Sequence, residues 1–391
     1  MREISIVGAG MTRFAKMPER DVIDLGREAC IKAIKSSGVP RKDIQIAYCG
    51  TARTGQLLNR ECGVGQTILL DIGISGIPVT SVGNFCASGS SALREAYLAI
   101  ASGMYDVALA IGVEKLSVRR GKGLPLTSDG VTLLTALGFS PPAYFAEIAT
   151  RHMYEFGTTE KQMALVTVKN RGHSRYNPNC QYQTSVTVEE VLASRPIVDP
   201  LRMLNCCPTT DGAGAILLCA KDLAWKYTDK PVDIIASSLH FGLYEKNKDM
   251  TTFNSDRASG KEAYEMAGLG PEDIDVAEVH DCFSIAEILH YEDLGFCPRG
   301  EGGPFVEQGK ADIGGEVAIN PSGGLLSRGH PLGGTGLAQT TEIFWQLRGE
   351  ADKRQVPGAR VGMTHTMGGF QDSIELADVA SSCIHIYRQG W

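Results

Sequence analysis

Short apolar segments alternate with segments of helical periodicity along the first 115 residues of this chain. Residues 107–112 form a continuous apolar run, as expected for a strand that is covered on both faces of a sheet. Residues 79–82 are rich in β-branched side chains, and residues 21–37 place apolar side chains at helical spacing before Gly38. The order strand, helix, strand, helix, strand predicts a layered α/β domain.

The same rhythm returns in the second half of the chain. Across the whole sequence we expect strands over 4–7, 44–50, 79–82, 106–112, 216–219, 232–239, 274–279, 359–363 and 374–377, and helices over 21–37, 63–70, 88–100, 143–155, 160–169, 258–267, 284–295 and 337–348. The order of these elements indicates two similar α/β halves, the first comprising residues 1–115 and 197–225 and the second residues 226–391. Residues 116–196 have weak periodicity, which is typical of an inserted lid or binding loop. The basic stretches of this insertion, at 119–122 and 169–175, suit either a phosphorylated ligand or a solvated face.

Composition excludes several classes of protein. The chain has 391 residues, 43% of them hydrophobic and 21% charged, as in an ordinary soluble globular protein. A net charge of −7 argues against binding to nucleic acid or to an anionic membrane. The eleven cysteines include no C-x-x-C pair, which argues against a disulfide framework and a structural zinc site. We therefore expect a cytoplasmic location and no metal site in this chain.

The glycines after the first strand suggest a dinucleotide-binding turn, and we reject that interpretation. Gly8 and Gly10 match the first two glycines of the G-x-G-x-x-G pattern of such turns, but Arg13 stands where the third glycine belongs. No acidic residue ends a second strand about 20 residues further on.

Cys86 lies at the predicted turn between the strand over 79–82 and the helix that begins near Ser88. The free N–H groups and positive dipole end of that helix favour a thiolate, and they favour an oxyanion formed beside the sulfur. Small residues at 83, 87 and 89 leave room for another molecule. The alternative is a buried structural cysteine, because free cysteine is among the most buried residue types.

Three turns of the second half stand out, and the first two carry reactive side chains. His280 and Cys282 share the turn after the strand over 274–279, where α/β sheets place ligands. His330 stands between a glycine and a proline in the loop that opens the helix over 337–348. A glycine turn, Met367-Gly368-Gly369, follows the strand over 359–363. Together with Cys86, these turns supply two thiols and two histidines, which is the inventory for covalent acyl transfer with acid/base help.

These motifs resemble those of the thiolase family over the whole length of the chain. Asn84-Phe-Cys86-Ala-Ser-Gly resembles the family's nucleophile motif, Gly329-His330-Pro331 its histidine motif, and Cys207–Ala213 the segment beside the pantetheine thiol. His280-Asp-Cys282-Phe is the variant of the sterol-carrier-protein type and of its archaeal and bacterial relatives. The common C-terminal Cys-x-Gly motif is replaced by Thr366-Met367-Gly368.

The resemblance implies a fold and a set of roles. The fold is two similar α/β halves in α-β-α-β-α layers with an inserted loop domain. Cys86 would be acylated, His330 would take its proton, and His280 with His330 would bind the acetyl enolate. The backbone N–H groups of Cys86 and Gly368 would form a second oxyanion hole, and Cys282 would move the proton on the acetyl Cα. Cys207, Met367 and Gly369 are expected at the bound substrate.

The resemblance also implies coenzyme A as co-substrate, a homodimer, and a small partner with an OB-fold and a zinc ribbon. The substrate alternatives are acetoacetyl-CoA and a bulky aromatic 3-oxoacyl-CoA such as benzoylsuccinyl-CoA. The loop over 121–139 would shape the acyl pocket, and we favour the bulky acyl group. Two other functions stay open: a decarboxylating ketoacyl synthase, and a non-catalytic acyl-CoA or lipid-binding subunit.

Overall fold

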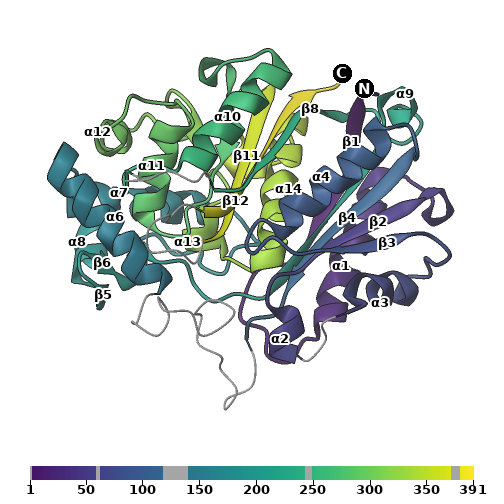
Figure 1. Cartoon of the computed structure of the whole chain (residues 1–391), viewed down its shortest axis with the longest axis horizontal. Helices are drawn as coiled ribbons and strands as arrows, with labels where there is room; N and C mark the ends of the chain where they lie inside the picture. Colours follow the sequence, from purple (N-terminus) through teal and green to yellow (C-terminus); the bar gives the residue numbers. More distant parts are fainter. Residues whose placement is uncertain (1, 59–61, 118–139, 243–248, 371–378) are drawn as a thin grey trace.

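The computed structural model describes residues 2–58, 62–117, 140–242, 249–370 and 379–391 (Figure 1). Ten strands form one sheet in the order β10-β9-β11-β12-β8-β1-β7-β4-β2-β3. Their bounds are β1 Ile4–Met11, β2 Ile46–Gly50, β3 Val79–Val82, β4 Val107–Glu114, β7 Gly212–Ala220, β8 Val232–His240, β9 Val276–Glu278, β10 Ala318–Ile319, β11 Val361–Phe370 and β12 Val379–Gln389. A separate antiparallel pair is formed by β5, Pro196–Val198, and β6, Leu201–Arg202.

The sheet consists of two five-stranded halves with the same topology. In the series β3-β2-β4-β7-β1, the first two pairings are parallel and the next two are antiparallel. The series β10-β9-β11-β12-β8 repeats this pattern pair by pair. The halves join where β1 pairs with β8, with Ile4 opposite Ile234. This repeat confirms the expectation of two similar α/β halves.

Two helices lie between the halves. Helices α4, Ser88–Ala101, and α14, Thr335–Arg348, contact each other and strands of both halves (Figure 1). Nearly every residue of α14 is buried, including Gln339 and Thr341, as expected for a helix covered on all sides. Both central helices follow turns that carry predicted site residues.

Other helices cover the outer faces. In the first half these are α1, Val22–Ser37, and α3, Val64–Asp71; in the second they are α10, Asn254–Ala267, with α11, Ser284–Asp293, packed beside it. Helix α1 begins and ends as the sequence predicts, because the Asp21 carboxylate accepts from the Ile23 N–H and Gly38 adopts φ 64° after the last turn.

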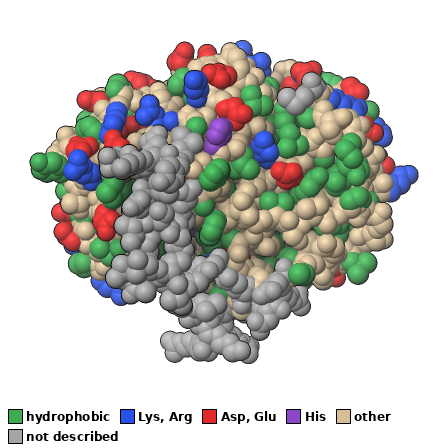
Figure 2. Space-filling view, in the orientation of Figure 1, with side chains coloured by type: hydrophobic (Ala, Val, Ile, Leu, Met, Phe, Trp, Pro, Cys, Tyr) green, Lys and Arg blue, Asp and Glu red, His purple; other side chains and the backbone are tan. Residues whose placement is uncertain are grey.

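Helices α6, Pro141–Phe156, and α7, Glu160–Ser174, confirm the two helices expected in the insertion, and each is longer than predicted. Helix α7 packs against α11 and against the short helices α12, Gly302–Glu307, and α13, Gly324–Arg328. The other short α-helices among the described residues are α2 Thr54–Leu58, α8 Val188–Ala193 and α9 Lys221–Ala224. The predicted acyl-pocket loop over 121–139, the basic stretch at 119–122 and the strand over 374–377 lie outside the described residues. Acidic and basic side chains are interspersed over the described part of the face in Figure 2.

Gly8 and Gly10 lie inside β1, and not after it as the sequence suggested. A Cβ atom on Gly10 would lie 2.5 Å from the backbone nitrogen of Ala33 and 2.7 Å from the carbonyl oxygen of Ala29. These glycines therefore let α1 pack directly on the strand, which is a structural reason for the pattern that resembled a dinucleotide site.

We expect the Gly10→Ala variant to be less stable by about 1–3 kcal/mol, because the new methyl group overlaps helix backbone that cannot move aside. The matched control is Gly172→Ala in α7, where a Cβ would meet no atom within 4 Å. That control is expected to gain about 0.5–1 kcal/mol from helix propensity. Urea unfolding of both variants measures the two free energies, and equal values would contradict the packing argument.

Candidate active site

Cys86 lies in the turn between β3 and α4, and side-chain hydrogen bonds shape that turn. The Ser88 hydroxyl donates to the Phe85 carbonyl at 2.6 Å and accepts from the Asn84 N–H at 2.9 Å. Phe85 adopts φ 48°, a left-handed conformation that is uncommon for a residue other than glycine. The turn therefore presents Cys86 immediately before the first residues of α4.

His330 follows α13 in the second half, and the Thr335 hydroxyl determines which of its ring nitrogens carries the proton. The Thr335 hydroxyl donates to the Pro331 carbonyl at 3.0 Å, so its oxygen accepts from Nδ1 of His330 at 2.8 Å. A neutral imidazole with its proton on Nδ1 has a free lone pair on Nε2. This arrangement prepares Nε2 of His330 to accept a proton.

His280 lies on a turn that is fixed from two sides. The Val279 N–H donates to Oδ1 of Asn320 at 2.9 Å, and the Asp281 carboxylate accepts from the N–H of Leu325 at 2.7 Å. This carboxylate ties the turn to the first residues of α13, the helix that precedes His330.

The structure brings Cys86, His280 and His330 together. One potential ligand atom of each, the sulfur or a ring nitrogen, lies within 4.8 Å of the other two. The two imidazole rings meet edge to face, with 4.9 Å between their centroids. The nucleophile candidate thus comes from the first half of the chain and both histidines come from the second.

Two further thiols lie beside these groups. The Cys207 N–H donates to the Cys282 carbonyl at 3.0 Å, so the segment expected at the pantetheine thiol runs along the turn of Cys282. Both side chains are at least half-buried, and both lie close enough to Cys86 that a thiolate there would raise the pKa of each thiol. The proton-transfer role of Cys282 and the substrate contact of Cys207 stay predictions.

The end of β11 closes over the Cys86 turn. A Cβ on Gly368 would lie 2.5 Å from the Asn84 carbonyl oxygen, so only glycine fits there. The N–H of Gly369 hydrogen-bonds the Cys86 sulfur. Met367 is buried in the same strand. All three residues that the sequence singled out therefore lie in the strand end that covers the cysteine, and the oxyanion role of the Gly368 N–H stays a prediction.

Burial reverses one expectation about Cys86. Its helix-terminal position suggested a thiolate, but burial raises the pKa of the Cys86 thiol to about 12, against the lowering effect of the Gly369 N–H. Burial likewise lowers the pKa of His330 to about 3, with Arg328 contributing. The resting pair is a neutral thiol beside a neutral imidazole, which is the arrangement for general-base activation.

We expect alkylation of Cys86 by iodoacetamide to accelerate about tenfold per pH unit from pH 6 to 9. The thiolate is the reactive species, and its fraction grows with pH everywhere below a pKa of about 12. Mass spectrometry of the Cys86 peptide follows this site separately from the other ten cysteines. A rate that levels off near neutral pH would show a thiolate in the resting protein.

Several residues of the site were not predicted. Asn320 and Asp281 act through hydrogen bonds to segments that are distant in sequence. Thr335 is in sequence an ordinary threonine at the start of a helix, and only the structure shows its hydroxyl beside His330.

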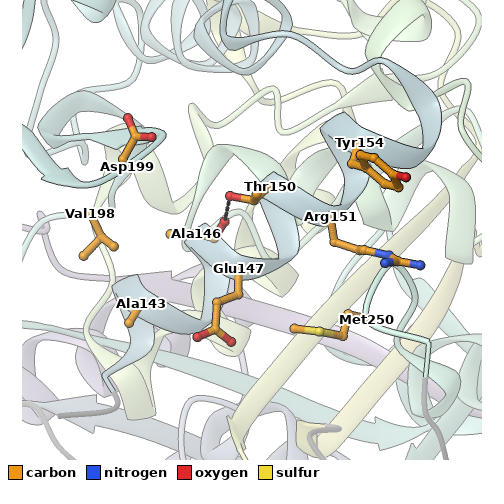
Figure 3. Close-up of a pocket in the computed structure, with 9 residues that line it drawn as sticks. All are labelled: Ala143, Ala146, Glu147, Thr150, Arg151, Tyr154, Val198, Asp199 and Met250. Atoms are coloured by element: carbon orange, nitrogen blue, oxygen red, sulfur yellow. Dashed lines mark hydrogen bonds between the residues drawn. The ribbon is translucent and has the colours of Figure 1, made fainter.

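A groove of about 670 Å³ was also not predicted, and it lies along α6 without contacting any predicted site residue (Figure 3). Its lining consists of Ala143, Ala146, Glu147, Thr150, Arg151, Tyr154, Val198, Asp199 and Met250.

None of the described helices is long and apolar enough to cross a membrane.

Two family models match the chain. Residues 4–133 match the thiolase N-terminal domain, and residues 237–377 match the thiolase C-terminal domain-like family. Acetyl-CoA acetyltransferase of Methanothermobacter thermautotrophicus is 43% identical over 374 residues, covering 94% of this chain and 97% of that protein. Sterol carrier protein 2 of Bos taurus is 40% identical, and the match covers 93% of this chain and 70% of that protein. Benzoylsuccinyl-CoA thiolase subunit BbsB of Thauera aromatica is 37% identical, covering 94% and 95%.

Solved structures agree with these matches. The Ltp2-ChsH2(DUF35) aldolase superposes with a TM-score of 0.83 at 25% identity, covering 99% of this chain and 98% of that one. Human mitochondrial 3-ketoacyl-CoA thiolase in complex with CoA superposes with a TM-score of 0.73 at 17% identity, covering 99% and 98%. The second likeness concerns the fold.

Proposed function

Because this chain belongs to the thiolase family of acyltransferases, we propose that it cleaves or forms the carbon–carbon bond of a 3-oxoacyl-CoA through an acyl-Cys86 intermediate. The observation that carries the proposal is the convergence of Cys86, His280 and His330 within 4.8 Å. A soft nucleophile, a prepared base and polar donors are what cleavage beside a ketone requires.

In the cleavage direction, Cys86 attacks the 3-oxo carbon and its proton passes to Nε2 of His330. The N–H groups of Cys86 and Gly368 stabilise the resulting oxyanion. The Cα–Cβ bond then breaks, and its electron pair moves into an acetyl-CoA enolate held by His280 and by the newly protonated His330. Cys282 donates its proton to that carbon, which releases acetyl-CoA.

The second half of the reaction restores every group. The thiol of CoA gives its proton to Cys282 and attacks the acyl thioester on Cys86. The shortened acyl-CoA leaves, and Cys86 recovers its proton from His330. Each proton and electron pair is thus returned, and the net change is transfer of an acyl group between carbon and sulfur.

Two substrates are supported by named relatives. The 43% identical archaeal acetyl-CoA acetyltransferase favours acetoacetyl-CoA, and the 37% identical benzoylsuccinyl-CoA thiolase subunit favours a bulky aromatic 3-oxoacyl-CoA. The same attack by Cys86 serves both. With benzoylsuccinyl-CoA the acyl group on Cys86 would be benzoyl, and the departing enolate would be that of succinyl-CoA in place of acetyl-CoA, because Cα of that substrate carries a carboxymethyl branch.

A second subunit is part of the proposal. One relative is named a subunit, and the 25% identical structural neighbour is a complex of Ltp2 with ChsH2(DUF35). We infer a homodimer of this chain that works with a small OB-fold and zinc-ribbon protein. The partner's zinc would lie outside this chain.

The test is acylation of Cys86 followed by thiolysis. Purified protein is mixed with acetoacetyl-CoA, longer aliphatic 3-oxoacyl-CoA or benzoylsuccinyl-CoA, with and without the small partner, and intact mass reports the acyl-enzyme. Addition of CoA should discharge it. Activity that requires an acyl carrier protein would favour the ketoacyl synthase, and no acylation under any condition would leave the binding-subunit hypothesis.

A further inference from the structure

A buried carboxylate on helix α11 accepts hydrogen bonds from its own helix and from two other segments of the chain. Glu287 has 0% exposure. Its Oε2 accepts from Nδ2 of Asn170 at 2.6 Å and from Nδ2 of Asn320 at 2.7 Å. Its Oε1 accepts from the Tyr291 hydroxyl and lies 2.8 Å from Nζ of Lys169. The reaction steps proposed above use none of these side chains.

The cation beside this carboxylate comes from the insertion. Lys169 opens the basic stretch over 169–175, for which a phosphorylated ligand or a solvated face was expected, and its side chain is only 3% exposed. Besides the contact with Glu287, Nζ donates to the side-chain oxygen of Asn170 at 2.6 Å and to the Ile319 carbonyl at 2.8 Å. The three donors of this ammonium group therefore have partners inside the protein, and Lys169 is not available to a phosphate.

Asn320 connects the carboxylate to the residue before His280. Its Oδ1 accepts from the Val279 N–H at 2.9 Å, while its Nδ2 donates to Glu287. A carboxylate paired with an ammonium group only accepts, so the amide nitrogen must face Glu287 and the amide oxygen must face the turn. Glu287 thereby fixes the orientation in which Asn320 can hold the backbone of Val279.

Asn170 makes the corresponding connection to the residue after His280. Its Nδ2 has two protons, of which one is donated to Oε2 of Glu287 and the other to Oδ2 of Asp281 at 2.8 Å. Burial and the charge of Glu287 raise the pKa of Asp281, but an oxygen of a neutral carboxyl group accepts this hydrogen bond as well. Both chain neighbours of His280 are therefore linked to one carboxylate.

The His280 imidazole depends on this turn for its position. Its Nδ1 is buried and has no hydrogen-bond partner among the described residues, and its ring meets that of His330 edge to face. The place of the ring beside His330 therefore follows the backbone of residues 279–281.

We propose that Glu287 is a positioning residue: paired with the Lys169 ammonium group, its carboxylate fixes the turn of His280 through the two asparagine amides. Its effect on rate rests on the proposed function, whereas its effect on the geometry of the turn does not. Because Lys169 and Asn170 belong to α7, this role gives a helix of the insertion a part in placing His280.

The alternative is an ion pair that only holds α7 against α11. Two apolar side chains of similar volume would then replace it without loss of activity, since such replacements of buried pairs are often neutral for stability. A positioning role needs, in addition, an acceptor for the two asparagine amides. Two double variants separate these cases.

The kinetic experiment compares these double variants in thiolysis. Lys169→Met with Glu287→Leu, the Leu pair, removes both charges and the acceptor. Lys169→Met with Glu287→Gln, the Gln pair, also removes both charges but keeps an amide oxygen that can accept from both asparagines. We expect kcat to fall about 10–100-fold in the Leu pair at nearly unchanged KM, and to be recovered to within about threefold of wild type in the Gln pair, because small displacements of a reacting group cost that much.

Two single variants complete the comparison. Tyr291→Phe is the control, because its hydroxyl donates to the same carboxylate but makes no hydrogen bond to residues 279–281 in the described part of the chain. Its kcat should change less than about threefold. Asn170→Ala keeps the ion pair and removes the connection to Asp281, so kcat should fall about tenfold, and this variant decides the question if the Leu pair does not fold.

Crystal structures of the two double variants test the placement of His280 without any substrate. We expect the 4.9 Å between the His280 and His330 ring centroids to be kept in the Gln pair and to change by about 1 Å in the Leu pair. Equal kcat in the two pairs, an equal loss in Tyr291→Phe, wild-type kcat in Asn170→Ala, or an unmoved His280 in the Leu pair would each overturn the proposal. If the wild-type protein shows no thiolysis but His280 moves in the Leu pair alone, the proposed function fails and the positioning role stands.

Discussion

Replacing Cys86 with alanine is expected to lower thiolysis by at least about 10³-fold and to abolish the acyl-enzyme mass. Without the sulfur there is no covalent intermediate, and the groups left at the site can only bind substrate and polarise it. Loss should appear in kcat, because the proposed backbone donors, the N–H groups of residue 86 and Gly368, belong to the turn and to β11 and do not depend on the sulfur. Intact mass spectrometry after mixing with each 3-oxoacyl-CoA measures the intermediate directly.

Cys297→Ser is the matched control for this experiment. Cys297 is a free, half-buried cysteine that follows α11 and lies outside the site. Its serine variant should retain activity within about twofold. Acylation that persists in Cys86→Ala, or that moves to Cys282, would reject Cys86 as the nucleophile.

The largest effect on stability is expected at Arg328. This side chain has 0% exposure, and its Nη1 donates to the Glu278 carboxylate and to the Ser322 hydroxyl, each at 2.9 Å. Arg328→Met would leave the buried Glu278 carboxylate without its cation. Removing one partner of a buried ion pair costs about 3–5 kcal/mol, and urea unfolding measures the change.

Two variants separate this effect from general loss of packing. Lys161→Met removes an exposed ion pair with Glu307 and should cost less than about 1 kcal/mol. Arg328→Met combined with Glu278→Gln should recover part of the lost stability, because no unpaired charge is left inside. If the single Arg328→Met variant were as stable as the Lys161 control, the ion pair would not hold this region together.

Arg328 also shows how the fold supports the site. Glu278 ends β9 two residues before His280, and Arg328 ends α13 two residues before His330. The ion pair therefore ties together the two segments that carry the histidines. A variant that retains the fold but loosens this pair should lose activity before it loses structure.

Most helices and strands could be predicted from sequence, because each segment has its own apolar periodicity and its own residues that begin or end it. The strand β12 was missed because its polar residues are satisfied by distant partners. Ser381 and Ser382 interrupt the apolar pattern, yet β12 lies inside the sheet, paired with β8 and β11. His385 in the same strand is buried against the Ser90 carbonyl of α4. Nothing within the segment itself shows that these partners exist.

The site divides in the same way. Reactive residue types at turns beside strands and helices pointed to Cys86, His280 and His330. The groups that fix their turns were not identifiable, since Asn320 and Val279 are 41 positions apart and meet only in the folded chain. The expected thiolate was wrong because a helix terminus can be read from sequence, whereas the burial that outweighs it cannot.

The matching topology of the two halves bears on the ancestry of this site. The turns before α4 and α14 occupy corresponding places in the two halves, and they carry Cys86 and His330. In an ancestor assembled from two identical half-chains, a residue acquired at one turn would have occurred at both. A cysteine on one side and a histidine on the other require two sequences that mutate independently. By this reasoning, the specialisation of nucleophile and base arose after the half-chain sequence had been duplicated.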